Sequence, residues 1–302
     1  MKTEVKIGSI VLCRPVMVAS GTFGYGEEYL DILDYSKIGA IVTKGITLRP
    51  REGNPPPRVA ETAAGMLNSI GLQNPGVEVF VRERLPFFRE NNIPCIVNVA
   101  GSSVEENAEI AGILDAEGDV AGVELNVSCP NVKKGGMAFG RSVALLEEVV
   151  SEVRKATSKT LITKLSPNVT DIVEMAKVAV EAGSDALSLT NTLLGMAIDI
   201  EKRKAILGGV TGGLSGPAIK PVSLRMVWEV CRNVDVPVIG MGGIATASDA
   251  VEFIIAGATA VAVGTATFYH PDAAARISDG ILEYMSAHGI DDIHDLIGSL
   301  RS

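Results

Sequence analysis

Aromatic side chains are scarce in this 302-residue sequence, at 4% of residues, and the four cysteines lie far apart with no CxxC pair. We therefore expect neither a disulfide framework nor an iron–sulfur cluster held by this chain. Lys and Arg are scattered along a chain whose formal net charge is −9, which argues against a surface for nucleic acid or another polyanion.

The sequence also lacks a long apolar segment of the kind that targets or anchors a protein. Its start, MKTEVKIGS, has no signal-peptide core. The longest uncharged run, residues 253–269, is interrupted by Gly257 and Gly264, so it fits a helix end, a turn and a buried strand better than a membrane span. We therefore expect a cytoplasmic protein in a reducing compartment.

Short β-branched runs alternate with longer segments whose apolar residues recur every three or four positions. The runs predict strands at 15–21, 40–47, 94–101, 122–130, 161–167, 186–192, 237–244 and 260–266. Helices are predicted at 77–91, 142–157, 170–183 and 248–257. Eight buried strands with helices between them favour an α/β fold, a (β/α)8 TIM barrel forming one domain over residues 1–302. The alternative is a doubly wound open sheet, but its GxGxxG fingerprint is missing, since the first strand leads into ASGTFGYGEE.

Two stretches are too long for a minimal βα connection. Residues 48–75 are rich in Pro, Arg, Asn and Gly, and residues 193–218 are rich in Gly. Insertions after barrel strands commonly build the active-site face, so we expect inserted loops at the carboxyl end of the strands.

Polar side chains recur where the predicted strands end. They are Lys44, Asn98, Asn126 followed by Cys129, Lys164, and the run from Thr190 to Thr192. Each has an ordinary structural explanation: an Asn forms turns, a lone Cys packs as a small hydrophobe, and a Lys extends its ammonium to solvent. Five successive strands that all carry such groups on one rim indicate a functional site instead.

The two lysines and the late glycines suggest what this site binds. An ammonium inside an apolar strand costs several kcal/mol in desolvation, which an anionic ligand such as a reduced flavin would offset. Lys164 could alternatively be the Schiff-base nucleophile of a barrel aldolase. GMGGI at 240–244 and GTA at 264–266 follow the seventh and eighth strands, where barrels commonly bind phosphate. Together these features predict FMN.

Over nearly its whole length the sequence resembles class 1 dihydroorotate dehydrogenases, through the segments GTFGYGEEY, TKGIT, NSIGLQNPG, NVSCPNVKKGGMAFG, TKLSPN, LTNT and GMGGI. It is most similar to the NAD-linked class 1B catalytic subunit. The resemblance implies an FMN-dependent oxidoreductase that converts (S)-dihydroorotate to orotate in pyrimidine biosynthesis. Cys129 is then the catalytic base at C5, and a Gly-rich segment at 133–140 is the expected lid over the site.

The resemblance also implies which residues bind the two small molecules, and it implies no metal site. The substrate-binding residues are expected to be Lys44, Asn68, Ser69, Ile70, Gly71, Leu72, Asn126, Asn131, Asn191 and Thr192. Those expected to bind FMN are Ser20, Lys44, Gly45, Asn98, Asn126, Lys164, Thr190, Gly216, Gly242, Gly243, Gly264 and Thr265.

For the NAD-linked subclass, the resemblance implies a partner that carries FAD and a [2Fe–2S] cluster, in a heterotetramer of two catalytic and two electron-transfer chains. A fumarate-linked homodimer is the alternative within the family, and pyrimidine-reducing enzymes share much of the motif around Cys129. Two other classes stay open: the Lys164 aldolase, and a barrel that serves only as a scaffold.

Overall fold

The computed structural model describes residues 1–128 and 139–301. Eight parallel strands close into a barrel, in the circular order β10-β15-β16-β3-β4-β7-β8-β9. They are β3 (Val16–Val18), β4 (Ala40–Val42), β7 (Cys95–Val99), β8 (Val120–Asn126), β9 (Thr160–Lys164), β10 (Ala186–Leu189), β15 (Val238–Met241) and β16 (Ala260–Val263). Each lies wholly or mostly within one predicted run. The (β/α)8 prediction is confirmed, and the open-sheet alternative is wrong because β16 pairs with β3 and closes the ring.

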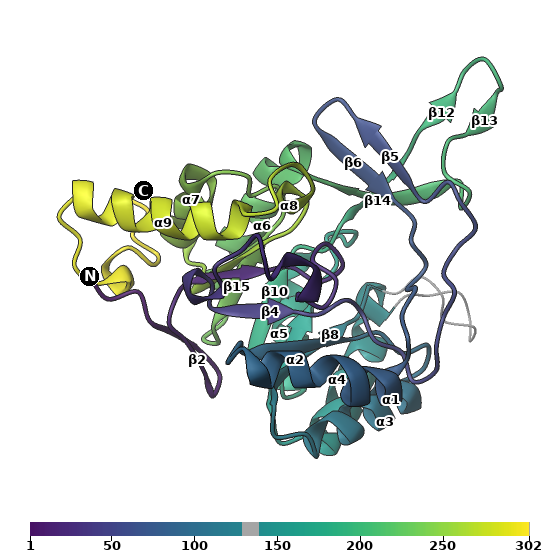
Figure 1. Ribbon diagram of the computed structural model, residues 1–302, viewed down its shortest axis with the longest axis horizontal. Helices are drawn as coiled ribbons and strands as arrows, with labels where there is room; N and C mark the ends of the chain where they lie inside the picture. Colours follow the sequence, from purple (N-terminus) through teal and green to yellow (C-terminus); the bar gives the residue numbers. More distant parts are fainter. Residues whose placement is uncertain (129–138, 302) are drawn as a thin grey trace.

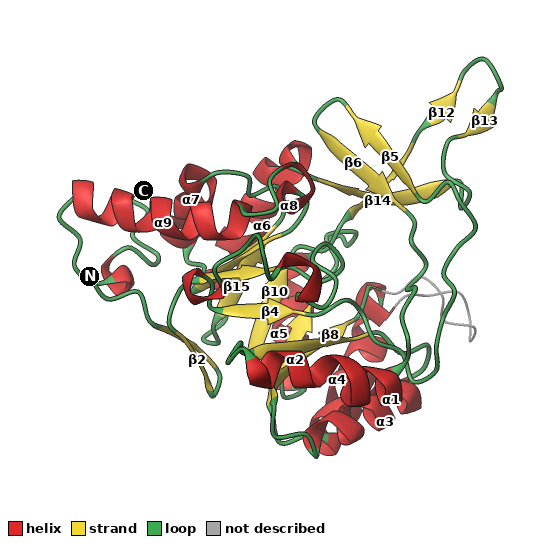
Figure 2. Ribbon diagram, viewed as in Figure 1, coloured by secondary structure: helices red, strands yellow, loops and turns green. Residues whose placement is uncertain are grey.

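Helices surround the barrel, as Figures 1 and 2 show. They are α1 (Val77–Val79), α2 (Leu85–Glu90), α3 (Val104–Asp115), α4 (Val143–Ala156), α5 (Ile172–Glu181), α6 (Lys220–Cys231), α7 (Ala247–Ala256), α8 (Ala266–Tyr269) and α9 (Ala273–Ala287). A π-helical segment, η3 (Phe80–Arg84), joins α1 to α2, so the predicted helix at 77–91 is irregular in its middle. Short 3₁₀ turns are η1 (Glu27–Tyr29), η2 (Tyr35–Lys37), η4 (Phe139–Arg141), η5 (Pro217–Ile219) and η6 (Ile293–Asp295).

Side-chain caps fix where several helices begin after the rim. Ser103, Ser142, Asp171 and Thr246 each accept a backbone N–H from the first turn of α3, α4, α5 and α7. Such caps satisfy donors that the helix leaves unpaired at its start. Within the described part of the chain, every helix is too short or too polar to span a membrane.

The two long insertions meet in one antiparallel sheet beyond the barrel. Its order is β11-β14-β6-β5, and its strands are β5 (Val59–Thr62), β6 (Gly65–Asn68), β11 (Leu193–Met196) and β14 (Thr211–Ser215). A hairpin of β12 (Ile198–Asp199) and β13 (Lys204–Ala205) extends from it, at the upper right of Figure 1. A separate hairpin, β1 (Val5–Ile7) with β2 (Ile10–Leu12), lies near the amino terminus. Because the insertions follow β4 and β10, the inserted sheet stands at the carboxyl end of the barrel, as expected.

Candidate active site

The predicted site residues that the structure describes all belong to the carboxyl rim of the barrel or to the inserted sheet. Asn98, Asn126 and Lys164 lie in the last two positions of β7, β8 and β9, and the others follow within a few residues of a strand. Lys44 lies two residues beyond β4 rather than inside it. The rim that the sequence predicted is therefore a single physical surface.

Lys164 lies at the centre of a buried polar cluster. Its Nζ donates to Ser20 Oγ at 2.8 Å and lies 3.5 Å from Glu124 Oε1. Asn98 Nδ2 donates to the same Glu124 oxygen at 2.6 Å, and Ser188 Oγ donates to the other at 2.9 Å. Four strands and the loop after β3 thus meet inside the barrel, and the cluster presents lysine, amide and hydroxyl groups below the rim.

A second cluster consists of amide side chains. Asn191 Nδ2 donates to Asn126 Oδ1 at 3.3 Å, and the backbone N–H of Ser128 donates to that oxygen at 3.1 Å. Asn68 is carried on β6, where its Nδ2 donates to the Gly213 carbonyl at 3.3 Å. These amides offer both donors and acceptors, which suits a planar heterocycle that presents both.

Gly213 brings the inserted sheet against the loop after β10. A Cβ added at Gly213 would lie 2.1 Å from Thr192 Oγ1, so only glycine allows this approach. Gly213 is also the register partner of Asn68. Asn68, from the first insertion, and Thr192, just before the second, are therefore neighbours across one glycine.

The segment Ser69 to Leu72 forms a tight loop after β6. Asn54 Nδ2 donates to the Ser69 side chain at 2.9 Å, and the Asn54 backbone N–H donates to the Ile70 carbonyl. Gly71 has a φ of 77° and Leu72 a φ of 57°. A Cβ added at Gly45 would lie 3.4 Å from Leu72 Cδ2, so this loop reaches the rim beside Lys44 and Gly45.

Lys44 is half-buried at the rim. Burial lowers the pKa of its ammonium, the Arg58 guanidinium lowers it further, and the Glu28 carboxylate partly opposes both. A half-buried amine with a lowered pKa holds its charge most firmly when an anion binds beside it. Lys44 is therefore suited to an anionic ligand.

The loops that contain Gly216, Gly242 and Gly243 lie close together. Gly216, Gly242 and Gly243 have φ values of 94°, 118° and 81°, in the region that favours glycine. A Cβ added at Gly243 would lie 2.8 Å from the Gly216 carbonyl oxygen, and one at Gly216 would lie 3.6 Å from the Thr265 methyl group. Thr265 Oγ1 donates to Ser215 Oγ at 2.8 Å. These loops present backbone without side-chain cover, which is the arrangement that binds phosphate.

Two residues of the predicted set, Cys129 and Asn131, lie outside the described residues, as does most of the expected lid at 133–140. The chain on either side is placed: Ser128 has a buried hydroxyl with no hydrogen-bond partner among the described residues. The Gly140 N–H donates to the Val127 carbonyl at 2.8 Å, which ties Gly140 to the segment directly after β8.

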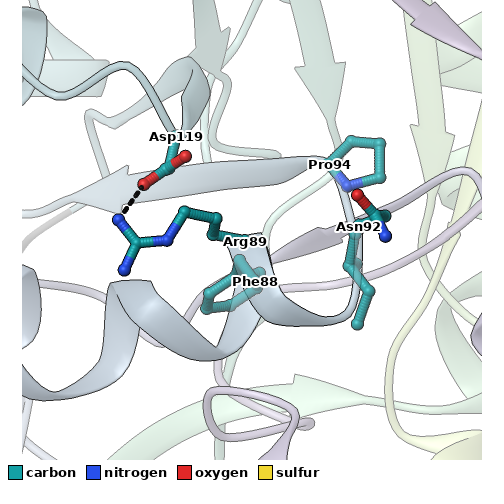
Figure 3. A pocket seen from close by; sticks show the side chains of 6 residues that line it. Phe88, Arg89, Asn92, Pro94 and Asp119 are labelled. Atoms are coloured by element: carbon teal, nitrogen blue, oxygen red, sulfur yellow. Dashed lines mark hydrogen bonds and ion pairs between the residues drawn. The ribbon is translucent and has the colours of Figure 1, made fainter.

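The described residues also line two surface hollows, one far from this rim and one beside it. One of about 270 Å³ is lined by Phe88, Arg89, Asn92, Ile93, Pro94 and Asp119, with Arg89 turned toward Asp119 at 3.4 Å (Figure 3). Pro94 and Asp119 precede β7 and β8, so this hollow lies at the amino end of the barrel and contains no predicted site residue. The other, of about 390 Å³, includes Gly21 and Thr22, directly after Ser20.

Glu124 is the main functional candidate that sequence reasoning missed. We expected a ligand to offset the buried charge of Lys164, yet the chain itself supplies a carboxylate, and Glu124 is fully buried. Its signal in the sequence was a charged residue two positions before Asn126, which places both side chains on one face of β8. Ser188 and Ser223 were missed as well, since a serine in a strand or helix is common.

Comparison with known proteins agrees with this geometry. A sequence model of the family described as dihydroorotate dehydrogenase matches residues 2–285. The chain is 60% identical over 297 residues to the dihydroorotate dehydrogenase B (NAD(+)) catalytic subunit of Geotalea uraniireducens, covering 98% of this chain and 97% of that one. It is 59% identical over 298 residues to the protein of the same name from Geotalea daltonii, covering 99% of this chain and 98% of that one. The crystal structure of dihydroorotate dehydrogenase from Eimeria tenella with ferulenol superposes with a TM-score of 0.82 at 26% identity, covering 99% of this chain and 88% of that one.

Proposed function

The chain belongs to the dihydroorotate dehydrogenase family, and from this premise we propose how its residues carry out the reaction. It is the catalytic subunit of an NAD(+)-linked dihydroorotate dehydrogenase, an oxidoreductase that converts dihydroorotate to orotate in pyrimidine biosynthesis. The family implies FMN as the cofactor. The assignment of individual residues, the single FMN-binding domain over residues 1–302 and the partner described below are our proposals.

The residues of the rim fit FMN from phosphate to ring. We assign the phosphate to Gly242, Gly243, Gly264 and Thr265, because Gly242 and Gly243 have positive φ values and glycine loops can present backbone N–H groups to an anion. We assign the remaining contacts to Ser20, Lys44, Gly45, Asn98, Asn126, Lys164, Thr190 and Gly216. Bound FMN supplies the acceptor for the hydride that leaves C6 of the substrate. Lys164 contributes positive charge where the ring gains electron density, which lowers the barrier to that transfer.

The amides orient the substrate. Asn126 and Asn191, 3.3 Å apart, and Asn68 beside Thr192 offer donors and acceptors to the ring amides and carboxylate of dihydroorotate. Asn131 is assigned to the same set, as are the residues from Ser69 to Leu72, whose loop lies beside Gly45. We assign the removal of the C5 proton from the substrate held in this way to the thiolate of Cys129, which acts as a general base.

The electrons then pass to a partner. The relatives are named as catalytic subunits, so a second kind of subunit belongs to the enzyme. We propose that the partner carries FAD and a [2Fe–2S] cluster, passes electrons to NAD⁺, and forms a cytoplasmic heterotetramer of two catalytic and two electron-transfer chains.

One observation carries the proposal: amide, hydroxyl and two lysine side chains from the barrel strand ends and the inserted sheet lie at the carboxyl end of the barrel, together with closely packed glycine loops. The test of the electron acceptor is to purify the chain alone and together with its electron-transfer subunit. With dihydroorotate as donor, we expect NAD⁺ reduction only with the partner, and little fumarate reduction by the chain alone. Efficient fumarate reduction by the lone chain would establish the homodimeric, fumarate-linked alternative.

A further inference from the structure

Glu124 is a carboxylate in the interior of the barrel for which neither the family's reaction nor the proposed site requires a role. It lies on β8, its side chain is 1% exposed, and that of Lys164 is 5% exposed. Burying an ionised carboxylate is costly unless it is paired and hydrogen-bonded. It contacts Asn98 and Lys164, both assigned to the proposed FMN site, which suggests a function beyond packing.

Each oxygen of Glu124 accepts a hydrogen bond. Oε1 accepts from Asn98 at 2.6 Å and lies 3.5 Å from Lys164 Nζ, and Oε2 accepts from Ser188 at 2.9 Å. Since an ionised carboxylate only accepts, it fixes the NH₂ group of Asn98 toward the interior and leaves the amide oxygen turned to the rim. A Cβ added at Gly45 would lie 2.9 Å from this Asn98 oxygen, so the oxygen is close to the backbone of Gly45.

The charges in this cluster balance. Lys164 supplies one positive charge and Glu124 one negative charge, and the other described contacts of the carboxylate come from neutral groups. Inside a barrel of low effective dielectric, both charges would act strongly on a ligand bound in contact with Lys164 or Asn98. Lys164 stabilises the extra electron density of a reduced flavin, and Glu124 opposes it.

We propose that Glu124 is a positioning residue that sets the reduction potential of the bound flavin, by balancing the charge of Lys164 and by fixing the orientation of Asn98. The inference rests on the proposed FMN site. With Lys164 alone, the reduced flavin would be held so firmly that onward transfer to a weak acceptor such as NAD⁺ would be unfavourable. The carboxylate keeps the potential low enough for electrons to leave.

The test replaces the carboxylate by an amide of the same shape, Glu124→Gln, in the FMN-loaded chain. The flavin potential is measured by anaerobic equilibration with a reference dye, and the affinities of the apoprotein for oxidised and reduced FMN are measured separately. We expect the variant to favour reduced over oxidised FMN at least tenfold more than the wild type, which corresponds to a rise of about 30 mV for a two-electron couple.

The matched control is Asp115→Asn, which also removes a carboxylate. Asp115 ends α3 and accepts the Ser158 N–H at 2.6 Å just before β9, at the amino end of the barrel. We expect the flavin reduction potential of the Asp115→Asn variant to equal that of the wild type. An unchanged or lowered potential in Glu124→Gln would overturn the inference while FMN binding itself still stands.

If Glu124→Gln does not fold, because Lys164 is left without its partner, a second pair of variants decides. Lys164→Gln and the double variant with Glu124→Gln both remove the buried ammonium. The double variant should have the higher potential, since it has also lost the negative charge. Equal potentials would refute the inference. A wild-type chain that binds no FMN would refute the proposed function instead, so the two failures are distinguishable.

Discussion

Substituting Gly242 by alanine should disrupt the proposed phosphate cradle from within. Gly242 has a φ of 118°, a conformation that residues with a side chain rarely adopt. An added Cβ would lie 2.2 Å from Ser223 Oγ and 3.0 Å from Thr190 Oγ1. These two hydroxyls share a buried hydrogen bond of 2.6 Å, so the Cβ would separate them.

The size of the effect follows from these contacts. Forcing alanine into this backbone conformation costs roughly 1–3 kcal/mol. Losing the bond between Thr190 and Ser223 adds about 1 kcal/mol. We therefore expect the free energy of unfolding to fall by about 2–4 kcal/mol, which lowers Tm by about 3–6 °C in a chain of this size. FMN affinity should fall as well, because Thr190 and the cradle are displaced together. Thermal unfolding of the apoprotein and FMN fluorescence titration measure the two effects.

Gly112→Ala is the matched control, with the opposite expected sign. Gly112 lies inside α3, and the nearest atom to an added Cβ is the Ala156 carbonyl oxygen at 3.7 Å. Alanine in a helix interior should stabilise the protein by about 0.5–1 kcal/mol and leave FMN affinity unchanged. Unchanged stability and FMN affinity in Gly242→Ala would refute the assignment of this loop to the cradle.

Three further predictions follow from the site and the fold. Cys129→Ser should slow the reduction of bound FMN by dihydroorotate about 100-fold or more near neutral pH, because a serine hydroxyl is far less ionised there than a cysteine thiol. Anaerobic stopped-flow measurements test this, and an unchanged rate would remove Cys129 from its role. Because the pKa of Lys44 is lowered from 10.5, its ammonium should lose its proton below that pH, and the KM for dihydroorotate should rise as pH rises through this range. Lys44→Gln should lack this rise. Because folding favours the neutral amine, the free energy of unfolding should increase over the same pH range. Hydrogen bonds from Ser158 and Thr157 lower the pKa of Asp115 below 3.8, so Asp115→Asn should be less stable than the wild type at neutral pH. This difference in the free energy of unfolding should shrink as pH falls below 3.8. An equal difference at every pH would contradict the prediction.

The barrel and its rim could be predicted because their signals are local. Each strand is a short buried run, and parallel strands must end at the same edge, so Asn98, Asn126 and Lys164 were placed together without knowledge of their contacts. The loops proposed to bind phosphate were identified in the same way, from their position after the last two strands.

The features that were missed depend on pairings between distant parts of the chain. The inserted sheet requires β6 to pair with β14, whose register joins Asn68 to Gly213, and nothing in either insertion specifies the other. The partners of Glu124 come from three other strands, so its role became visible only once the barrel closed. The charged residue two positions before Asn126 was a signal, but the sequence does not show which groups pair with its carboxylate and donate hydrogen bonds to it.

The most direct test of the account is a visible spectrum of the purified chain, followed by anaerobic addition of dihydroorotate. We predict a flavin spectrum that bleaches on addition, because the chain both binds FMN and transfers hydride to it without its partner. A protein that remains colourless after incubation with FMN would contradict the cofactor site. A flavin spectrum that dihydroorotate does not bleach would contradict the assignment of the rim to this substrate.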